Sequence, residues 1–198
     1  MKNEIKGRVI CTSSGDWIGP DCAAPTIEDA ACALGKLCRY AGHCKDFYSV
    51  LVHSLVVDDL TEGDAKLYAL IHDTTESVMN DVPKPFKIPE MGELEARIYC
   101  RILRDWGIPY PEKHVLVQVH AADYEALCGE VWTNGPPRLR QLKMFRKRSK
   151  RAEKLVKYYS KKYPARDTIE VSGKAVREFI SRYKKYKSQL DRTEIYGN

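Results

Sequence analysis

The sequence has no long apolar run. No stretch of its 198 residues approaches the ~20 consecutive apolar side chains that a helix needs to cross a bilayer. The first eight residues mix charges and lack the apolar segment of a signal peptide. Both absences argue against a membrane-embedded or secreted protein. We therefore expect a soluble protein of the cytoplasm with no membrane partner.

Cysteine pairs at metal-binding spacing are absent too. The seven cysteines include no Cys-x-x-Cys pair, and their odd number without a secretion signal predicts free thiols in a reducing compartment. Cys32 and Cys38 fall in a predicted helix, where cysteine acts as a small apolar side chain. Internal repeats are lacking, and the only compositional bias is a basic one near the C-terminus.

The composition favours one domain. Hydrophobic residues make up 43% and charged residues 30% of the chain, which suffices for a single buried core, whereas a second full domain would be crowded. The net charge of +6 is concentrated in residues 138–187, as in a nucleic-acid surface, a site for phosphorylated small molecules or a solvated face. We expect a core with an N-terminal arm over residues 1–135. Residues 136–198 would be a basic helical extension packed on the same domain.

Most of the chain shows helical periodicity. Thr26 and Asp29 match a capping box, and Asp64 is the expected cap of a later helix. Three prolines within residues 81–89 exclude a regular helix there, and residues 9–11 read as a short strand. The predicted helices cover approximately residues 26–38, 48–60, 64–72, 90–106, 112–132, 138–162 and 173–190. The expected fold is an all-α bundle with a short arm that can form a small β-hairpin.

Histidine and aspartate side chains recur within these helices. His53 lies in an apolar helical segment, where an imidazole needs a buried partner. The adjacent residues His72 and Asp73 end the next helix, and Asp123 lies among small residues that let another helix approach. Neighbours on a helix are about 100° apart, so His72 and Asp73 can reach one ion only near a helix end or through the choice of side-chain rotamer. Each residue alone has a structural explanation, but together they indicate a shared site.

Two imidazoles and two carboxylates suit a first-row divalent metal ion, namely Co²⁺, Mn²⁺, Zn²⁺, Fe²⁺ or Ni²⁺. An additional Mg²⁺ is compatible with the same set. An ion with only four protein ligands keeps positions for water and for a substrate phosphate. Because such an ion lowers the pKa of bound water and withdraws charge from phosphoryl oxygens, the residues predict metal-assisted hydrolysis of a phosphate ester.

The order H…HD…D resembles the HD superfamily of metal-dependent phosphohydrolases, in particular the bacterial 5′-deoxynucleotidases. Residues 27–34, 39–43 and 47–50 look like those of phage-encoded HD phosphohydrolases. These include the dATP triphosphohydrolases of phages that replace adenine with 2-aminoadenine. The resemblance covers roughly residues 14–127, and the basic C-terminal third matches no motif. The segments that carry it are His53-Ser54, His72-Asp73-Thr74-Thr75-Glu76, Asp81-Val82-Pro83-Lys84-Pro85-Phe86-Lys87 and Asp123.

The resemblance implies a role for each matching residue. The metal ligands would be His53, His72, Asp73 and Asp123. For the chemistry, it implies that Glu76 orients or deprotonates the attacking water and that Asp81 lies near the sugar or acts as a second acid–base group. The implied substrate-binding residues are Arg39 at the phosphates, Lys84 and Lys87 as added charges, and Trp17 and Ile18 at the base. His43 is close enough in sequence to reach a phosphate or a second metal ion, or it could be a loop histidine with no role.

Plainer roles remain open for several of these residues. Arg39 could be a favourable cation at a helix C-terminus, and Trp17 could anchor the arm to the core. Glu76 could lie on a helix surface, and Asp81 could simply begin the proline-rich turn.

The leading hypothesis is hydrolysis of a deoxynucleotide, with a purine and dATP in particular favoured by the phage resemblance. A triphosphate would give deoxynucleoside and tripolyphosphate, and a monophosphate would give phosphate. The resemblance also implies a homo-oligomer and, for a phage-encoded chain, the host cytoplasm. The alternatives are a 5′-deoxynucleotidase for monophosphates, an HD hydrolase of a guanosine alarmone or cyclic nucleotide, and a nucleic-acid-binding protein with a vestigial metal site.

Overall fold

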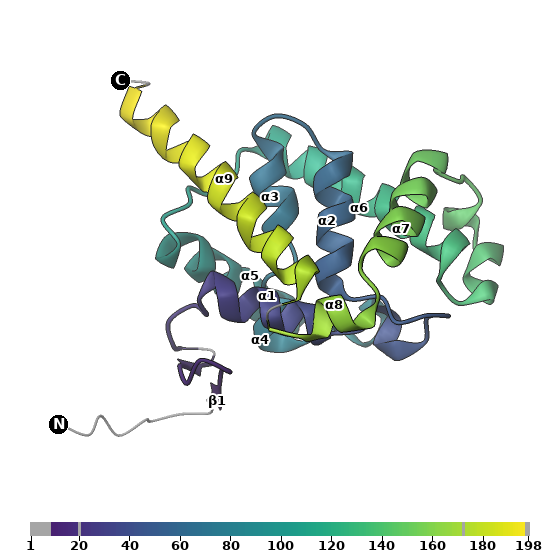
Figure 1. Cartoon of the computed structure of the whole chain (residues 1–198), viewed down its shortest axis with the longest axis horizontal. Helices are drawn as coiled ribbons and strands as arrows, with labels where there is room; N and C mark the ends of the chain where they lie inside the picture. The colour runs from purple at the N-terminus through teal and green to yellow at the C-terminus, as the bar shows by residue number, and fades with distance from the viewer. Residues whose placement is uncertain (1–8, 20, 172, 197–198) are drawn as a thin grey trace.

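Helices account for most of the computed structural model, which describes residues 9–19, 21–171 and 173–196 (Figure 1). The all-α prediction is confirmed; the charged N-terminus, residues 1–8, lies outside the described residues. The helices are α1 (Ile27–Lys36), α2 (Val50–Leu60), α3 (Ala65–Ile71), α4 (Glu76–Met79), α5 (Pro89–Asp105), α6 (Lys113–Thr133), α7 (Lys150–Lys162), α8 (Ala165–Ile169) and α9 (Lys174–Tyr196). Short 3-10 turns are η1 (Arg39–Gly42), η2 (Lys84–Phe86), η3 (Pro137–Gln141) and η4 (Lys143–Phe145).

Helix α2 is the centre of the core. Residues 50–58 are all buried, as expected for a helix that is apolar on every side. Helices α1, α3, α6, α7 and α9 all pack against it (Figure 1). Its position fixes His53 inside the protein, where its backbone cannot shift without disturbing several helices.

Of the two capping residues predicted from the sequence, one caps its helix and the other does not. Thr26 accepts a hydrogen bond from the backbone N–H of Asp29 at 3.1 Å, as the capping box predicts. Asp64 precedes α3 but makes no side-chain cap. The Asp64 carboxylate instead lies 3.3 Å from His114 Nε2, so the prediction of a side-chain cap is wrong there.

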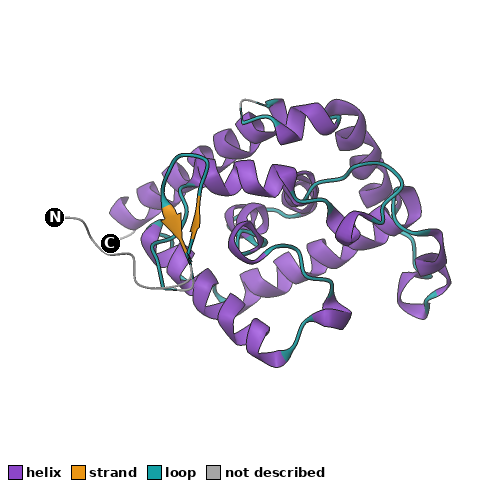
Figure 2. Cartoon of the chain, turned by 90° about the horizontal axis from the view of Figure 1, so that it is seen from below, coloured by secondary structure: helices purple, strands orange, loops and turns teal. Residues whose placement is uncertain are grey.

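The predicted N-terminal strand is part of a small hairpin. Strand β1 (Ile10–Cys11) pairs antiparallel with β2 (Trp17–Ile18) at one end of the helical body (Figure 2). The hydroxyl groups of Ser13 and Ser14 donate to Asp29 and so attach the hairpin to α1. Ile18 is buried, whereas Trp17 is 49% exposed.

The helix expected over residues 138–162 begins only at Lys150. Residues 138–149 form 3-10 turns and loop, because a run of cations without acids gains no stabilising ion pairs along a helix. Ser149 then caps α7 by accepting from the N–H of Ala152 at 3.2 Å.

Two short helices, α4 and α8, were not predicted because one turn shows no periodicity. Cys38 lies beyond the end of α1, so its placement in a helix was also wrong.

A buried network of charges joins the C-terminal helix to α2. The Asp58 side chain is fully buried and accepts from Arg182 Nη1 at 2.5 Å, and Asp59 accepts from the same nitrogen at 2.7 Å. Arg182 Nη2 donates to Tyr159 and Glu178, both at 2.6 Å. Part of the basic C-terminal third therefore neutralises acidic residues of the core.

Replacing Arg182 with methionine is expected to lower the free energy of unfolding by about 3 kcal/mol, because it leaves the buried Asp58 carboxylate with less compensation. Lys66 Nζ lies 3.0 Å from the Asp58 carboxylate and still compensates part of its charge, so we expect no larger loss of unfolding free energy. Chemical denaturation would measure it. Lys184→Met is the matched control on the same helix, since Lys184 and Glu28 are both mostly exposed and such pairs contribute little. Equal losses in the two variants would contradict the network's role.

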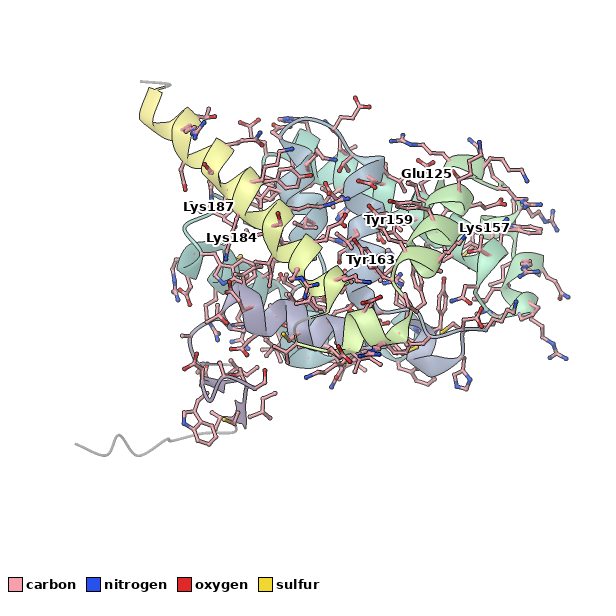
Figure 3. All side chains as sticks on the ribbon, in the orientation of Figure 1. Glu125, Lys157, Tyr159, Tyr163, Lys184 and Lys187 are labelled. Atoms are coloured by element: carbon pink, nitrogen blue, oxygen red, sulfur yellow. The ribbon has the colours of Figure 1, made fainter. Side chains whose placement is uncertain are left out.

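The tyrosines of the C-terminal third mostly pack rather than face solvent. Tyr159, Tyr163 and Tyr183 are buried in the core. Figure 3 shows Tyr159 on α7 and Tyr163 just past its C-terminal end, beside α2. Tyr158 is 54% exposed. The three buried rings cannot stack on nucleic-acid bases in this conformation.

None of the helices in the described residues combines the length and apolarity that a membrane span requires.

Candidate metal centre

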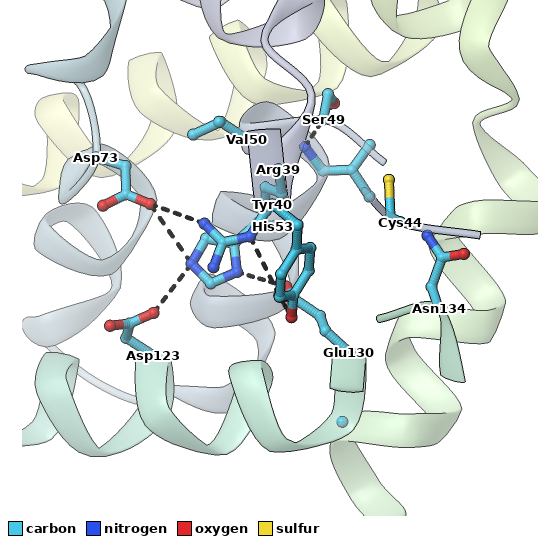
Figure 4. A network of polar contacts seen from close by, with 12 residues as sticks. Arg39, Tyr40, Cys44, Ser49, Val50, His53, Asp73, Asp123, Glu130 and Asn134 are labelled. Carbon is cyan, nitrogen blue, oxygen red and sulfur yellow. Dashed lines mark hydrogen bonds and ion pairs between the residues drawn. The ribbon is translucent and has the colours of Figure 1, made fainter. Parts of the chain in front are cut away.

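Four side chains from three parts of the fold converge beside α2. His53 comes from the middle of α2, Asp73 from the turn after α3, and Asp123 from α6 (Figure 4). His72 precedes Asp73 at the end of α3. His53 Nε2 lies 3.3 Å from His72 Nε2 and 3.1 Å from the Asp123 carboxylate. Asp73 Oδ2 is 3.5 Å from His53 Nε2 and 3.2 Å from His72 Nε2. A His53–His72–Asp123 group thus lies within metal-binding distance, and Asp73 contacts both histidines.

The other nitrogen of each imidazole has a fixed partner. His53 Nδ1 lies 2.6 Å from Glu130 Oε1, and His72 Nδ1 lies 2.8 Å from the carbonyl of Ala69. Because both partners are acceptors, each Nδ1 carries a proton and each Nε2 faces the shared centre. This orientation of the two rings is the one that metal-binding histidines adopt.

The charges around the centre favour a cation there. Burial opposes charge on His72, but Asp73 and Asp123 outweigh it and raise the pKa of His72 to about 9. The pKa of Asp123 falls to about 2 because hydrogen bonding and charge from His53 overcome its burial. Protons on the imidazoles thus balance the carboxylates when no metal is bound. A divalent ion would displace those protons.

Glu130 was missed by the sequence analysis. Its side chain is fully buried and accepts from Arg39 Nε and from the Tyr40 hydroxyl, both at 3.1 Å, besides holding His53. Burial opposes its ionisation, but Arg39 and His53 lower the pKa of Glu130 to about 2. The available signal was its spacing: Glu130 follows Asp123 by seven residues, two turns along the same face of α6.

Two further carboxyl groups lie close to the centre. The Glu76 Oε2 atom is buried without a hydrogen-bond partner among the described residues. Burial, with the charges of Asp73 and Asp81, raises the pKa of Glu76 to about 9. Burial also raises the pKa of Asp81, whereas Arg39 opposes that shift. These groups can hold a proton beside the predicted metal ligands.

The predicted substrate residues divide into two sets. Arg39 lies inside the centre, where Nη1 donates to Asp73 at 3.5 Å, and Ile18 lines a cavity of about 180 Å³ together with Ser77 of α4. His43 and Lys84 are exposed, and Lys87 is bound to Glu95 at 2.6 Å. The structure therefore brings Arg39 to the four ligands, while Lys87 already has a partner.

Part of the chain is similar to a known bacterial protein. No family model matches the chain. The chain is similar to a protein of Escherichia coli (strain K12) named uncharacterized protein YfdR, with 36% identity over 85 residues. The aligned part covers 42% of this chain and about half, 48%, of that protein.

Adding Co²⁺ at about 100 times its dissociation constant is expected to raise the free energy of unfolding by about 2.7 kcal/mol, because the ion binds the assembled ligands of the folded state. For a chain of this size the melting temperature would rise by roughly 5–10 °C. Differential scanning fluorimetry with and without a chelator measures the shift. A similar shift in the His53→Ala protein would contradict binding at this centre.

Proposed function

We propose that this chain is a metal-dependent phosphohydrolase of the HD type that acts on deoxynucleotides. The observation that carries the proposal is the convergence of two oriented imidazole Nε2 atoms with the Asp73 and Asp123 carboxylates. The order of these residues along the chain supports it, as does the resemblance to HD phosphohydrolases. Four ligands of this kind suit Co²⁺, Mn²⁺, Zn²⁺, Fe²⁺ or Ni²⁺.

The ligands fit such an ion, which when bound would lower the pKa of a water molecule and polarise a phosphate. The protein side chains then have separate tasks. Glu76 would accept the proton of the attacking water, since a bound cation nearby would lower the high pKa of the carboxyl group. Arg39, held by Glu130, would direct its guanidinium toward the phosphate side of the centre. Asp81 would receive or return a proton near the leaving 5′ oxygen.

Within this class, we favour a deoxynucleoside triphosphate of the dATP type, with release of deoxynucleoside and tripolyphosphate. Action on monophosphates is the neighbouring possibility. The preference for a purine follows from the resemblance to phage enzymes, and it is supported by Ile18 of the hairpin, which lines cavities together with residues of α4. A homo-oligomer in the cytoplasm is part of the same proposal.

A substrate panel tests the proposal directly. The purified protein is incubated with each dNTP and dNMP in the presence of Mn²⁺ or Co²⁺, and the products are separated by ion-exchange chromatography. We expect deoxynucleoside with tripolyphosphate, and the fastest turnover with dATP. Phosphate released only from dNMP would instead indicate a 5′-deoxynucleotidase. Absence of nucleoside from every substrate, with His53→Ala behaving like the parent, would overturn the proposal.

A nucleic-acid-binding protein is the alternative of a different class. The exposed cations Arg146, Lys147, Lys150 and Arg151 favour it, whereas the burial of three tyrosines, Tyr159, Tyr163 and Tyr183, does not. Arg148 is bound to Glu153 at 2.6 Å and lies over the Trp132 ring. A gel shift at two salt concentrations separates the two classes, because binding to a phosphate backbone weakens steeply with salt.

A further inference from the structure

A loop beside the metal centre begins and ends at a cysteine. Cys38 and Cys44 flank η1, and their Sγ atoms are 3.4 Å apart. Both side chains are half-buried and both thiols are free. Since the sulfur atoms of a disulfide are about 2.05 Å apart, a movement of little more than ~1 Å would join them.

The backbone on each side of the loop is held by hydrogen bonds. Directly after Cys38, the N–H of Arg39 donates to the carbonyl of Tyr48 at 2.9 Å. Directly after Cys44, the N–H of Lys45 donates to the carbonyl of Asn134 at 2.8 Å, at the end of α6. Because both ends are fixed to neighbouring elements, the two sulfurs stay opposite each other.

The residues between the cysteines connect to the metal centre. Tyr40 and Ala41 have φ angles of 59° and 50°, a left-handed conformation that non-glycine residues adopt at an energetic cost. This path brings both Arg39 and Tyr40 to the carboxylate of Glu130 (Figure 4). Glu130 in turn holds the imidazole of His53. A bond between the two sulfurs would therefore close a covalent ring of the chain that contains Arg39 and Tyr40, the two residues that donate to Glu130.

We propose that Cys38 and Cys44 form a reversible oxidation site, at which a small-molecule disulfide such as oxidised glutathione converts the two thiols into an intramolecular disulfide. The site is independent of the proposed function, because it depends only on the geometry of the two sulfurs and requires neither metal nor substrate.

The exchange proceeds in two balanced steps. Burial and the hydrogen bond with Cys38 raise the pKa of Cys44 to about 11, so Cys44 keeps its proton near neutral pH and Cys38 is the attacking sulfur. Cys38 loses its proton to solvent, and its thiolate attacks oxidised glutathione, forming a mixed disulfide and releasing one glutathione thiolate. Cys44 then gives its proton to solvent, attacks the Cys38 sulfur and expels the second glutathione thiolate. The protein loses two electrons, which reduce oxidised glutathione to two thiols.

Peptide mapping tests the proposal on the full-length folded protein. After incubation with oxidised glutathione, free thiols are alkylated and the protein is digested with trypsin without reductant. Trypsin cuts after Lys36, Arg39 and Lys45, so the disulfide would join peptides 37–39 and 40–45. We expect this linked pair in the mass spectrum and its loss after treatment with dithiothreitol.

Two controls make the result decisive. In the Cys44→Ser protein the reaction should stop with one glutathione on Cys38, because the second sulfur is missing. The exposed Cys100 reports whether the oxidant acted, and it should carry glutathione alone. Glutathione on Cys100 with both Cys38 and Cys44 alkylated would overturn the proposal. So would glutathione on both loop cysteines in place of the linked peptides.

Discussion

Under the proposed function, the His53→Ala protein is expected to bind metal poorly and to hydrolyse deoxynucleotides more than ~100-fold more slowly than the parent. This loss is larger than the one caused by removing an outer-shell partner of a ligand. His53 supplies one of the nitrogen atoms at the centre, and its side chain is completely buried. Alanine removes that ligand and leaves Glu130 facing a cavity. Metal analysis by mass spectrometry after Co²⁺ loading, together with turnover of dATP, measures both effects.

Two companion variants guard against loss of folding as the explanation. Asp123→Asn removes a ligand whose side chain is 41% exposed, so it should lose metal while the far-ultraviolet circular dichroism spectrum stays unchanged. His120→Ala changes an exposed histidine on the same helix and should keep both metal and activity. A His53→Ala protein with full metal content and full turnover would show that the centre is not the site.

The Glu130→Gln protein is expected to bind Co²⁺ or Mn²⁺ about 10- to 100-fold more weakly, the usual effect of changing a partner behind a metal-binding histidine. Glutamine can still accept from His53 Nδ1 but lacks the negative charge that makes the imidazole a stronger ligand. It also turns an amide NH₂ toward Arg39 or Tyr40, which now donate to the second carboxylate oxygen. Titration against a metal-binding dye measures the affinity.

The matched control is Glu112→Gln, which makes the same chemical change at a carboxylate that is 82% exposed just before α6. Its metal affinity should equal that of the parent protein. Because Glu130 is buried, the melting temperature without metal is recorded alongside, so that a loss of stability is not read as a loss of affinity. Unchanged affinity in the folded Glu130→Gln protein would contradict the orienting role.

The sequence pointed to His53, His72 and Asp73 of the candidate centre because their surroundings carry a local signal, whereas Asp123 depended more on the resemblance. His53 interrupts an apolar helix, and His72 and Asp73 end the next one. Glu130 carries a weaker signal, since a glutamate near a helix end is typical of an exposed position. Only its contacts with Arg39 and His53, 91 and 77 residues away along the chain, distinguish it from a surface residue.

In the C-terminal third, the sequence predicted the helices but not the partners of their charged residues. The periodicity of α7 and α9 is visible in the sequence, whereas the residue with which each cation pairs is not. Arg182 binds Asp58, 124 residues earlier, and thereby becomes part of the core. Residues 138–149 look helical by composition, yet Ser149 starts the helix later and the preceding cations remain in turns.

By itself, the sequence determined that the chain is helical and which residue types could bind a metal, since periodicity and residue chemistry are local properties. The tertiary structure decided which of those residues meet. It placed both Nε2 atoms at one point, fixed each Nδ1 on an acceptor, and brought Arg39 to Glu130. It also set Cys38 against Cys44 across a left-handed turn. These contacts depend on how α2, α3 and α6 pack together, and packing is a property of the whole core.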